Sequence, residues 1–237
     1  MEKYKKDMDL SYSFGIFPTF ELVSKLPQHV IKVMIHQKLK ISNDVQNLIN
    51  LCKQNNIFVE FCTKQIEKIT DKENTLIVGV FKKYQSSVQN NCNHVVLYNP
   101  SDMGNLGTII RTCLGFDIKN IAIIAPCCDV FNPKTIRASM GAIFSVNIQI
   151  FDCFTDYTNA CPNQNLYPFM LQATHTLQSL TNSQKRTPYS LIFGNEGSGL
   201  DQSFLNVGQS IIINHSKNID SLNLPISVSI ALYEFNK

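Results

Sequence analysis

Residues 99 to 111, NPSDMGNLGTIIR, form a turn-rich segment that leaves an apolar run and opens a helical one. Asn105 is well placed as the N-cap of this helix, because its side-chain oxygen can accept an unpaired N–H group of the first turn. Arg111 projects about 130° from the centre of the apolar stripe at 100° per residue, so packing does not require it. From periodicity alone, an ordinary surface arginine and a functional arginine are equally good interpretations.

A second segment, residues 191 to 200, LIFGNEGSGL, runs from a buried strand into three glycines and one carboxylate. Because glycine lacks Cβ and tolerates positive φ, the backbone N–H groups of such a loop can approach a ligand closely. Glu196 would be unusual beside phosphates, so it indicates a cationic or hydroxylic ligand or an arginine partner. A plain strand-to-helix turn is the commoner meaning of a glycine cluster on its own.

The third segment is the C-terminal stretch 221–235, SLNLPISVSIALYEF. Asn223 can cap a helix in which Pro225 is tolerated in the first turn. The helix is apolar on every side apart from two serines and a glutamate, which predicts burial in a deep core or against a second subunit. Ser221 and Asn223 would lie at the mouth of that core. The three segments together offer an arginine, amides, a hydroxyl and a carboxylate, groups suited to a sugar–phosphate target.

Strands and helices must position these segments, and alternating strand-like and helical sequence patterns indicate where those elements lie. We expect strands at 94–98, 120–124, 143–150 and 190–193 and helices at 106–114 and 133–140. Strands that alternate with helices predict an α/β fold with a mostly parallel sheet, whose functional loops lie at the strand ends. The polar segment 152–162 is expected to be a surface loop.

The preceding part of the chain predicts a separate, smaller α/β domain, residues 10–83. Helices are expected at 19–25, 42–54 and 63–69 and strands at 29–36, 57–61 and 75–80, with Ser42 or Asn43 capping the second helix. His29 and His36 flank a strand, and we expect ordinary structural roles for both. Residues 84–93, YQSSVQNNCN, have the polar composition of a linker. The second domain then spans 94–237.

Composition sets limits on the function. The chain has 237 residues, of which 44% are hydrophobic and 16% charged, enough apolar material for two packed cores. A net charge of +3 permits a polyanionic partner without establishing one. The eight cysteines contain no C-x-x-C pair and no zinc-ligand spacing, so no metal site is expected. Without a secretory-type leader or an apolar run of about 18 residues, we expect a cytoplasmic protein with reduced thiols and no membrane association.

Taken together and in this order, the three segments resemble the SpoU-type (TrmH-like) branch of the SPOUT RNA 2′-O-ribose methyltransferases. The resemblance covers His94 to Phe235, and residues 131–144, FNPKTIRASMGAIF, look like the family's middle segment. The residues that fit its three motifs are Asn105, Gly107 and Arg111 in the first, Gly194, Asn195, Glu196, Gly197 and Gly199 in the second, and Ser221, Leu222 and Asn223 in the third.

The resemblance implies a parallel α/β sheet with a deep trefoil knot, an exception to the usual absence of knots. It implies that S-adenosylmethionine binds in the knot and that a homodimer completes the RNA site. The residues assigned to the cofactor are Gly194, Asn195, Gly197, Ile213, Leu222 and Asn223. The N-terminal domain resembles the family's optional RNA-recognition domain, which is related to ribosomal proteins that bind kinked RNA. Where the family usually has Ile-Pro-Met, this chain has Ile213-Asn214-His215, and loss of the proline puts cofactor affinity in question.

The implied reaction is transfer of a methyl group to a ribose 2′-hydroxyl of RNA, without a metal. In the family the arginine that corresponds to Arg111 activates the hydroxyl with help from RNA phosphate, and polarisation is easier to defend than proton abstraction because a guanidinium stays protonated. Asn105 and Glu196 would orient Arg111 and the ribose, while Ser221 and Asn223 position the site. The extra domain favours ribosomal RNA over transfer RNA as substrate.

Two alternatives remain open at this point. The first is a non-catalytic RNA-binding relative with the same fold, for which Asn214-His215 is the sequence hint. A nucleotide-dependent oxidoreductase is weaker, because the first strand-to-helix turn lacks G-x-G-x-x-G. Cofactor-binding calorimetry would separate all three.

Overall fold

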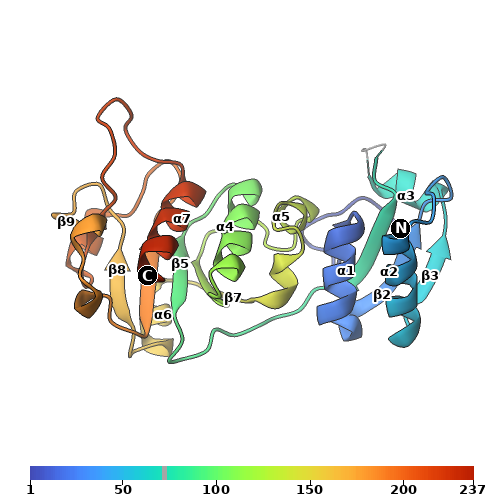
Figure 1. Ribbon diagram of the computed structural model, residues 1–237, viewed down its shortest axis with the longest axis horizontal. Helices are drawn as coiled ribbons and strands as arrows, with labels where there is room; N and C mark the ends of the chain where they lie inside the picture. Colours follow the sequence, from blue (N-terminus) through green and yellow to red (C-terminus); the bar gives the residue numbers. More distant parts are fainter. Residues whose placement is uncertain (71–73) are drawn as a thin grey trace. The chain divides into compact units, whose positions relative to one another are not determined.

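The computed structural model describes residues 1–70 and 74–237, and the chain divides into two compact units (Figure 1). The N-terminal unit consists of Met1–Tyr84 together with Asp129–Ser145, and the C-terminal unit consists of Gln85–Cys128 together with Val146–Lys237. The segment that resembles the family's middle motif therefore clusters with the N-terminal unit. Within the described ranges, no helix is both long enough and apolar enough to cross a bilayer.

The N-terminal unit contains a four-stranded sheet in the order β1-β4-β2-β3, in which only β2 and β3 are parallel. Its elements are β1 (Leu10–Phe14), α1 (Ile16–Lys25), η1 (Pro27–His29), β2 (Val30–Ile35), α2 (Asn43–Gln54), β3 (Phe58–Phe61), α3 (Lys64–Ile69), β4 (Ile77–Lys82), α5 (Pro133–Ala138) and η2 (Ala142–Ser145). Ser42 caps α2 as predicted, because its side chain accepts the Val45 N–H. The apolar face of α2 packs against Val33 and Ile35 of β2.

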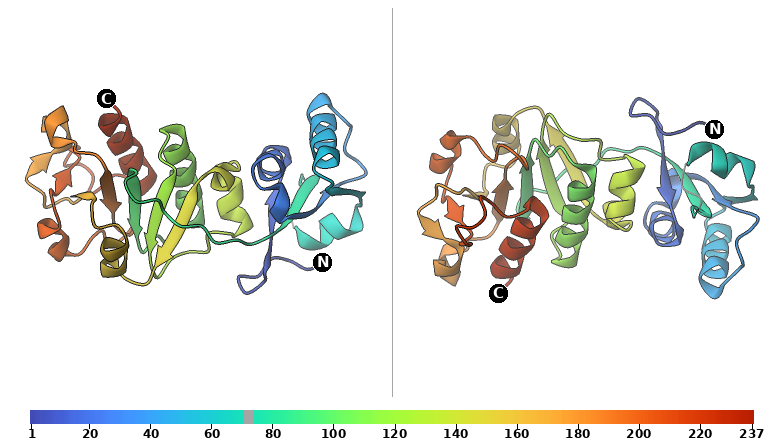
Figure 2. Two further views of the ribbon diagram at one scale, coloured as in Figure 1. Left: turned by 90° about the horizontal axis from the view of Figure 1, so that it is seen from below. Right: turned by 90° about the horizontal axis from the view of Figure 1, so that it is seen from above.

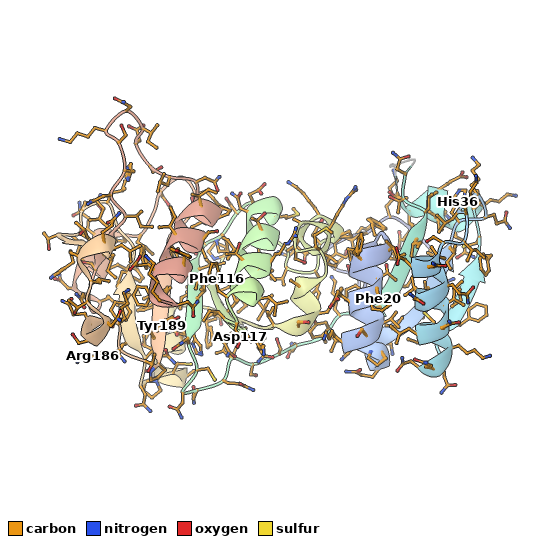
Figure 3. The ribbon with its side chains drawn as sticks, viewed as in Figure 1. Phe20, His36, Phe116, Asp117, Arg186 and Tyr189 are labelled. Atoms are coloured by element: carbon orange, nitrogen blue, oxygen red, sulfur yellow. The ribbon has the colours of Figure 1, made fainter. Side chains whose placement is uncertain are left out.

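Two features of the N-terminal unit bear on the sequence predictions. His36 is buried and its Nδ1 accepts the Lys38 N–H at 3.0 Å, a structural role as expected (Figure 3). Strand β1 was not predicted, since two of its inward positions are serines. Ser13 is nevertheless fully buried, and its hydroxyl pairs with that of Thr19 at 2.9 Å.

The C-terminal unit contains a five-stranded sheet in the order β7-β6-β5-β10-β8. Every neighbouring pair in it is parallel, which confirms the predicted α/β fold with a mostly parallel sheet. A parallel pair of two-residue strands, β9 and β11, lies outside it. The strands and 3₁₀ helices are β5 (His94–Tyr98), β6 (Asn120–Ile124), β7 (Asn147–Phe151), β8 (Asn165–Pro168), β9 (His175–Thr176), η3 (Leu177–Ser179), η4 (Asn182–Gln184), β10 (Tyr189–Phe193), η5 (Gln202–Asn206) and β11 (Ile211–Ile212).

Helices cover both faces of this sheet. Figure 2 shows α4 (Met103–Gly115) and α7 (Leu224–Phe235) on one face and α6 (Phe154–Ala160) on the other. Helices α4 and α7 contact each other. The Asn236 side chain, just after α7, donates to the Phe116 carbonyl, just after α4, at 3.4 Å. The two helices are therefore parallel, and their N-termini lie at the same end of the unit. Tyr189 packs against Phe235 at the opposite end (Figure 3).

Three local predictions were wrong. Helix α4 starts at Met103, and its N-cap is Asp102, whose carboxylate accepts the Asn105 N–H at 2.8 Å. Asn105 therefore lies inside the first turn. The segment 152–162 is not a loop but contains α6, because Tyr157 is buried against the sheet. The strand expected at 143–150 is shifted: residues 142–145 form the 3₁₀ helix η2, and β7 starts at Asn147.

Helix α7 begins after Asn223 and contains Pro225 in its first turn, as predicted. Within this chain it is buried on one face only. Ile226 is 51% exposed and Tyr233 is 59% exposed. These two residues are seven positions apart, so they lie on one side of the helix.

Candidate active site

Two of the three predicted segments meet at the carboxyl ends of adjacent strands. Strands β5 and β10 are parallel neighbours in which Phe193 pairs with Leu97. The loop that follows Tyr98 and the glycine loop that follows Phe193 therefore lie side by side. This edge of a parallel sheet is where ligands of open α/β folds bind.

The Glu196 carboxylate joins the two loops. Its Oε2 accepts hydrogen bonds from the Ser101 N–H at 3.1 Å and the Ser101 hydroxyl at 2.8 Å. Its Oε1 accepts the Asp102 N–H at 3.1 Å and the Asn105 side-chain amide at 3.4 Å. These donors lie at the N-terminus of α4, where the helix dipole favours a negative charge.

The same contacts keep Glu196 ionised. Partial burial raises the pKa of this carboxyl, but hydrogen bonds donated by its own backbone N–H, by Ser101 and by Asp102 outweigh burial and lower the pKa. Glu196 therefore carries a negative charge at neutral pH. Its carboxylate is directed at residues 101 to 105, so it links the glycine loop of the second motif to the first motif through hydrogen bonds.

Asn195 fixes the glycine loop from within. Its amide nitrogen donates to the Asn99 carbonyl at 2.7 Å, and its Oδ1 accepts the Gly197 N–H at 2.9 Å. The backbones of Asn195 and Gly199 close the loop with hydrogen bonds of 3.2 and 3.0 Å. A Cβ on Gly194 would lie only 2.1 Å from the Gly199 carbonyl carbon, and Gly199 has a φ of +70°. Both glycines are therefore required for the closed loop.

A cleft of about 200 Å³ opens beside the glycine loop. It combines groups of that loop, among them Ser198, with apolar side chains, Gln172, two further serines and an imidazole. The side chains include Phe169, Met170, Phe193, Leu200, Ile211, Ile213, His215, Ser221, Leu222, Leu224 and Ser227. The rings of Phe169 and Phe193 stack with centroids 4.6 Å apart. Such a lining suits a ligand that has both a flat apolar part and a polar part.

The cleft brings together most of the residues assigned from the sequence. Those that line it are Gly194, Asn195, Glu196, Gly197, Ile213, Ser221 and Leu222. Asn223 is exposed at the start of α7, and its side chain makes no capping hydrogen bond. Asn105 reaches the site through its contact with Glu196.

Arg111 lies apart from the lining residues. It is exposed on the outer side of α4, on the same face as Gly104 and Thr108, so packing does not require it, as predicted. In the described part of the chain, Glu196 makes no hydrogen bond or ion pair with Arg111, although the sequence suggested an arginine partner. The physical reason is that Glu196 directs both oxygens at residues 101 to 105.

Sequence reasoning missed two contributors. Ser101 gives two hydrogen bonds to Glu196, although only its position in the turn before the cap could have indicated this. Phe169 follows β8, a strand that the sequence pattern did not reveal. Its backbone N–H donates to the Ile192 carbonyl at 2.8 Å, which places its ring at the cleft.

Over residues 1–70 and 74–237, no group of three or more His, Cys, Asp or Glu side chains is arranged to hold a metal ion. Cys128 lies near the loop that follows β5, because its backbone N–H donates to the Pro100 carbonyl at 2.8 Å. Burial, with the nearby Cys127, Glu196 and Asp102, raises the pKa of Cys128 to about 12, so the thiol stays protonated.

Known proteins resemble this chain in sequence. It is 32% identical over 143 residues to an uncharacterized tRNA/rRNA methyltransferase of Synechocystis sp., a match that covers 59% of this chain and 51% of that protein. It is 28% identical over 135 residues to the 23S rRNA (guanosine(2553)-2′-O)-methyltransferase RlmP of Bacillus subtilis, covering 56% and 53%. The chain thus matches about half the length of these relatives.

The fold also has a solved counterpart. An AdoMet-bound rRNA methyltransferase from Sinorhizobium meliloti superposes with a TM-score of 0.79 at 24% identity, over 96% of this chain and 87% of that one. At this identity the likeness supports the fold. Residues 93–233, more than half of the chain, match the model of the SpoU rRNA Methylase family. The chain therefore belongs to the SpoU rRNA Methylase family.

Proposed function

We propose that this chain transfers a methyl group from S-adenosylmethionine to a ribose 2′-hydroxyl of RNA. The observation that carries the proposal is the cleft beside the loop that follows β10, where residues of the second and third family motifs line one space. Family membership and the name of the Bacillus subtilis relative, a 2′-O-methyltransferase, support the same reaction.

The lining residues fit the cofactor. The backbone of Gly194, Asn195 and Gly197 supplies polar groups, and Ile213 and Leu222 supply apolar surface. Asn223, at the edge of the site, completes the set. When bound, S-adenosylmethionine supplies a methyl group activated by a sulfonium. A metal is not needed for this chemistry.

The chain's own residues would orient and polarise the nucleophile. A ribose hydroxyl must lose its proton, to the neighbouring RNA phosphate or to water, as its oxygen gains the methyl group, and a positive charge beside that oxygen favours the loss. Arg111 provides this charge and also attracts the neighbouring RNA phosphate. Asn105, held by Glu196, and the pair Ser221 and Asn223 position the ribose. Glu196 acts by holding the first motif in place.

We further propose the deep trefoil knot and a homodimer. The knot is supported by the cleft, at which three successive segments of the C-terminal part, 194–199, 211–215 and 221–224, come together. The dimer is supported by the exposed apolar residues Ile226 and Tyr233 on the outer side of α7. Helix α4 lies beside α7, so a second copy seated there would also cover the helix that carries Arg111.

Residues 10–83 are proposed as the RNA-recognition domain, with residues 84–93 as the linker and residues 94–237 as the methyltransferase domain. The N-terminal unit, which contains residues 10–83, carries 15 Lys and Arg against 10 Asp and Glu, whereas the C-terminal unit carries 6 against 8. The positive charge that a phosphate backbone requires is therefore concentrated in the N-terminal unit. A separate recognition unit favours ribosomal RNA, with transfer RNA as the alternative. We place the activity in the cytoplasm, where such RNAs are available.

Alkaline hydrolysis of methylated RNA tests the reaction directly. Strand cleavage needs a free 2′-oxygen, so the product should resist cleavage at one nucleotide, and a 2′-deoxy substitution there should abolish methyl transfer. Comparing 2′-O-methyl maps of RNA from cells with and without the gene would identify the substrate. Label that stays with the base after removal of the sugar would overturn the proposal. Absence of cofactor binding in calorimetry would support the second candidate, a non-catalytic RNA-binding relative that lacks the family's Pro-Met after Ile213.

A further inference from the structure

The proposed cofactor cleft contains one imidazole, that of His215, which belongs to none of the three family motifs. His215 is half-buried and lines the cleft two residues after Ile213. Its Nδ1 lies 2.9 Å from the Ile213 carbonyl oxygen. The imidazole is therefore held against the backbone of a residue already assigned to the cofactor.

This hydrogen bond determines the tautomer of the neutral ring. A carbonyl oxygen can only accept, so the proton lies on Nδ1, and Nε2 keeps its lone pair. Among the described residues, Nε2 has no hydrogen-bond partner. His215 thus brings an acceptor to the cleft that the protein itself leaves unused.

The other ionisable groups at the cleft cannot serve in its place, and the Gln172 amide and the serine hydroxyls that also line it do not titrate. Glu196 is the only other ionisable side chain among the lining residues, and both of its oxygens accept hydrogen bonds from residues 101 to 105. The Asn195 amide is engaged with the backbone. Lys217 and Asp220, in the loop that contains His215, are exposed and outside the lining.

We propose that His215 is a pH-dependent cofactor-binding residue, whose neutral Nε2 accepts a hydrogen bond from an amino group of S-adenosylmethionine. The inference rests on the proposed function and deepens it. Protonation of the ring turns this acceptor into a donor, and the new positive charge opposes the sulfonium. Binding of the cofactor is then expected to weaken as the pH falls, and binding of its uncharged-sulfur product, S-adenosylhomocysteine, should weaken less.

Isothermal titration calorimetry of the full chain at pH 7.0 and 5.5, with each ligand, tests the inference. We expect the dissociation constant for S-adenosylmethionine to rise several-fold between pH 7.0 and pH 5.5, because a protonated imidazole can no longer accept the hydrogen bond. In His215→Gln, whose amide oxygen can accept but does not titrate, the constant should stay within about twofold of its pH 7.0 value. His175→Gln, at an exposed position outside the cleft, should retain the wild-type dependence.

A second readout does not depend on any variant. The His215 ring can be titrated by NMR in the wild-type protein, and saturating S-adenosylhomocysteine should shift its protonation to lower pH. An unchanged titration, or a His215→Gln protein with wild-type pH dependence, would overturn the role of His215 and leave the proposed function intact. No binding of either ligand at pH 7.0 would instead overturn the proposed function.

Discussion

The Ser101 hydroxyl donates to Glu196 Oε2 at 2.8 Å, and so joins two motifs that lie 95 residues apart in the sequence. The contact spans the carboxyl ends of two neighbouring parallel strands. Glu196 also receives two backbone N–H groups at the start of α4. The first motif is thus held in place by a residue of the second, and the cofactor loop and the loop that leads to Arg111 form one assembly.

Removing the Ser101 hydroxyl should therefore loosen the site with little effect on folding. We expect Ser101→Ala to lower the free energy of unfolding by about 1 kcal/mol, because the bond is charge-assisted but partly exposed. The two backbone donors remain. The rate of methyl transfer should fall several-fold, since Asn105 and Ser101 share the same carboxylate. Urea unfolding and steady-state kinetics measure the two effects, and Ser203→Ala, at an exposed position outside the cleft, serves as control.

The charge of Glu196 makes a pH-dependent contribution to stability. Its pKa is lowered in the folded protein, so this stabilisation is complete above the unfolded value near 4.5 and is lost as the pH falls through the folded value. Glu196→Gln should therefore be less stable than wild type at pH 7, and the difference should shrink below about pH 4.5. Denaturant titrations at pH 7, 5 and 4 check this. A difference that stayed constant with pH would mean that Glu196 stabilises by packing alone.

The closed glycine loop predicts a sharp contrast between two glycines. Gly194→Ala places a Cβ 2.1 Å from the backbone of Gly199, which must move, so cofactor binding should be lost and stability should fall by about 1–3 kcal/mol. Gly115 lies at the end of α4, and a Cβ there meets nothing within 4 Å. Gly115→Ala should therefore be neutral or slightly stabilising. Calorimetry and thermal unfolding of the two variants measure these effects. Cofactor affinity unchanged in Gly194→Ala would refute the role of the loop.

Arg111 should separate catalysis from binding. Its side chain is exposed on α4 and does not line the cleft, so Arg111→Ala should keep the fold and the cofactor affinity. Methyl transfer should fall by about 10²-fold or more, because the charge beside the ribose oxygen is lost. Arg111→Lys should recover only part of the rate, since an ammonium lacks the bidentate geometry. Near-normal turnover by Arg111→Ala would show that another group activates the hydroxyl.

The sequence revealed the parts of the fold in which apolar periodicity is strong. Strands β5 and β6 were predicted to the residue, because their apolar runs are bounded by polar turns. Strand β1 was missed because its buried serines look polar in the sequence, whereas in the fold Ser11 donates to the Phe131 carbonyl and Ser13 pairs with Thr19. Helix α6 was missed because one buried tyrosine stands among polar residues. The N-cap was misplaced since Asp102 and Asn105 are both good caps, and only the fold shows that Glu196 engages Asn105. Contacts between loops 95 residues apart have no local signature.

The outer side of α7 yields the last prediction. Ile226 and Tyr233 are half or more exposed on one side of a helix that is otherwise apolar and packed on the chain's own sheet. Two large apolar side chains in one row favour association with a second copy of the same surface, as expected of a two-fold dimer. Light scattering at micromolar concentration should therefore give twice the monomer mass, and Ile226→Asp should give the monomer, because a buried unpaired carboxylate opposes association.

Ile150→Asp is the matched control: Ile150 is 50% exposed on β7, at the far edge of the sheet, and its variant should remain dimeric. Loss of the dimer should leave cofactor affinity measurable, while methyl transfer should fall if a second copy completes the RNA site. A wild-type protein of monomeric mass would show that α7 keeps this face exposed to solvent.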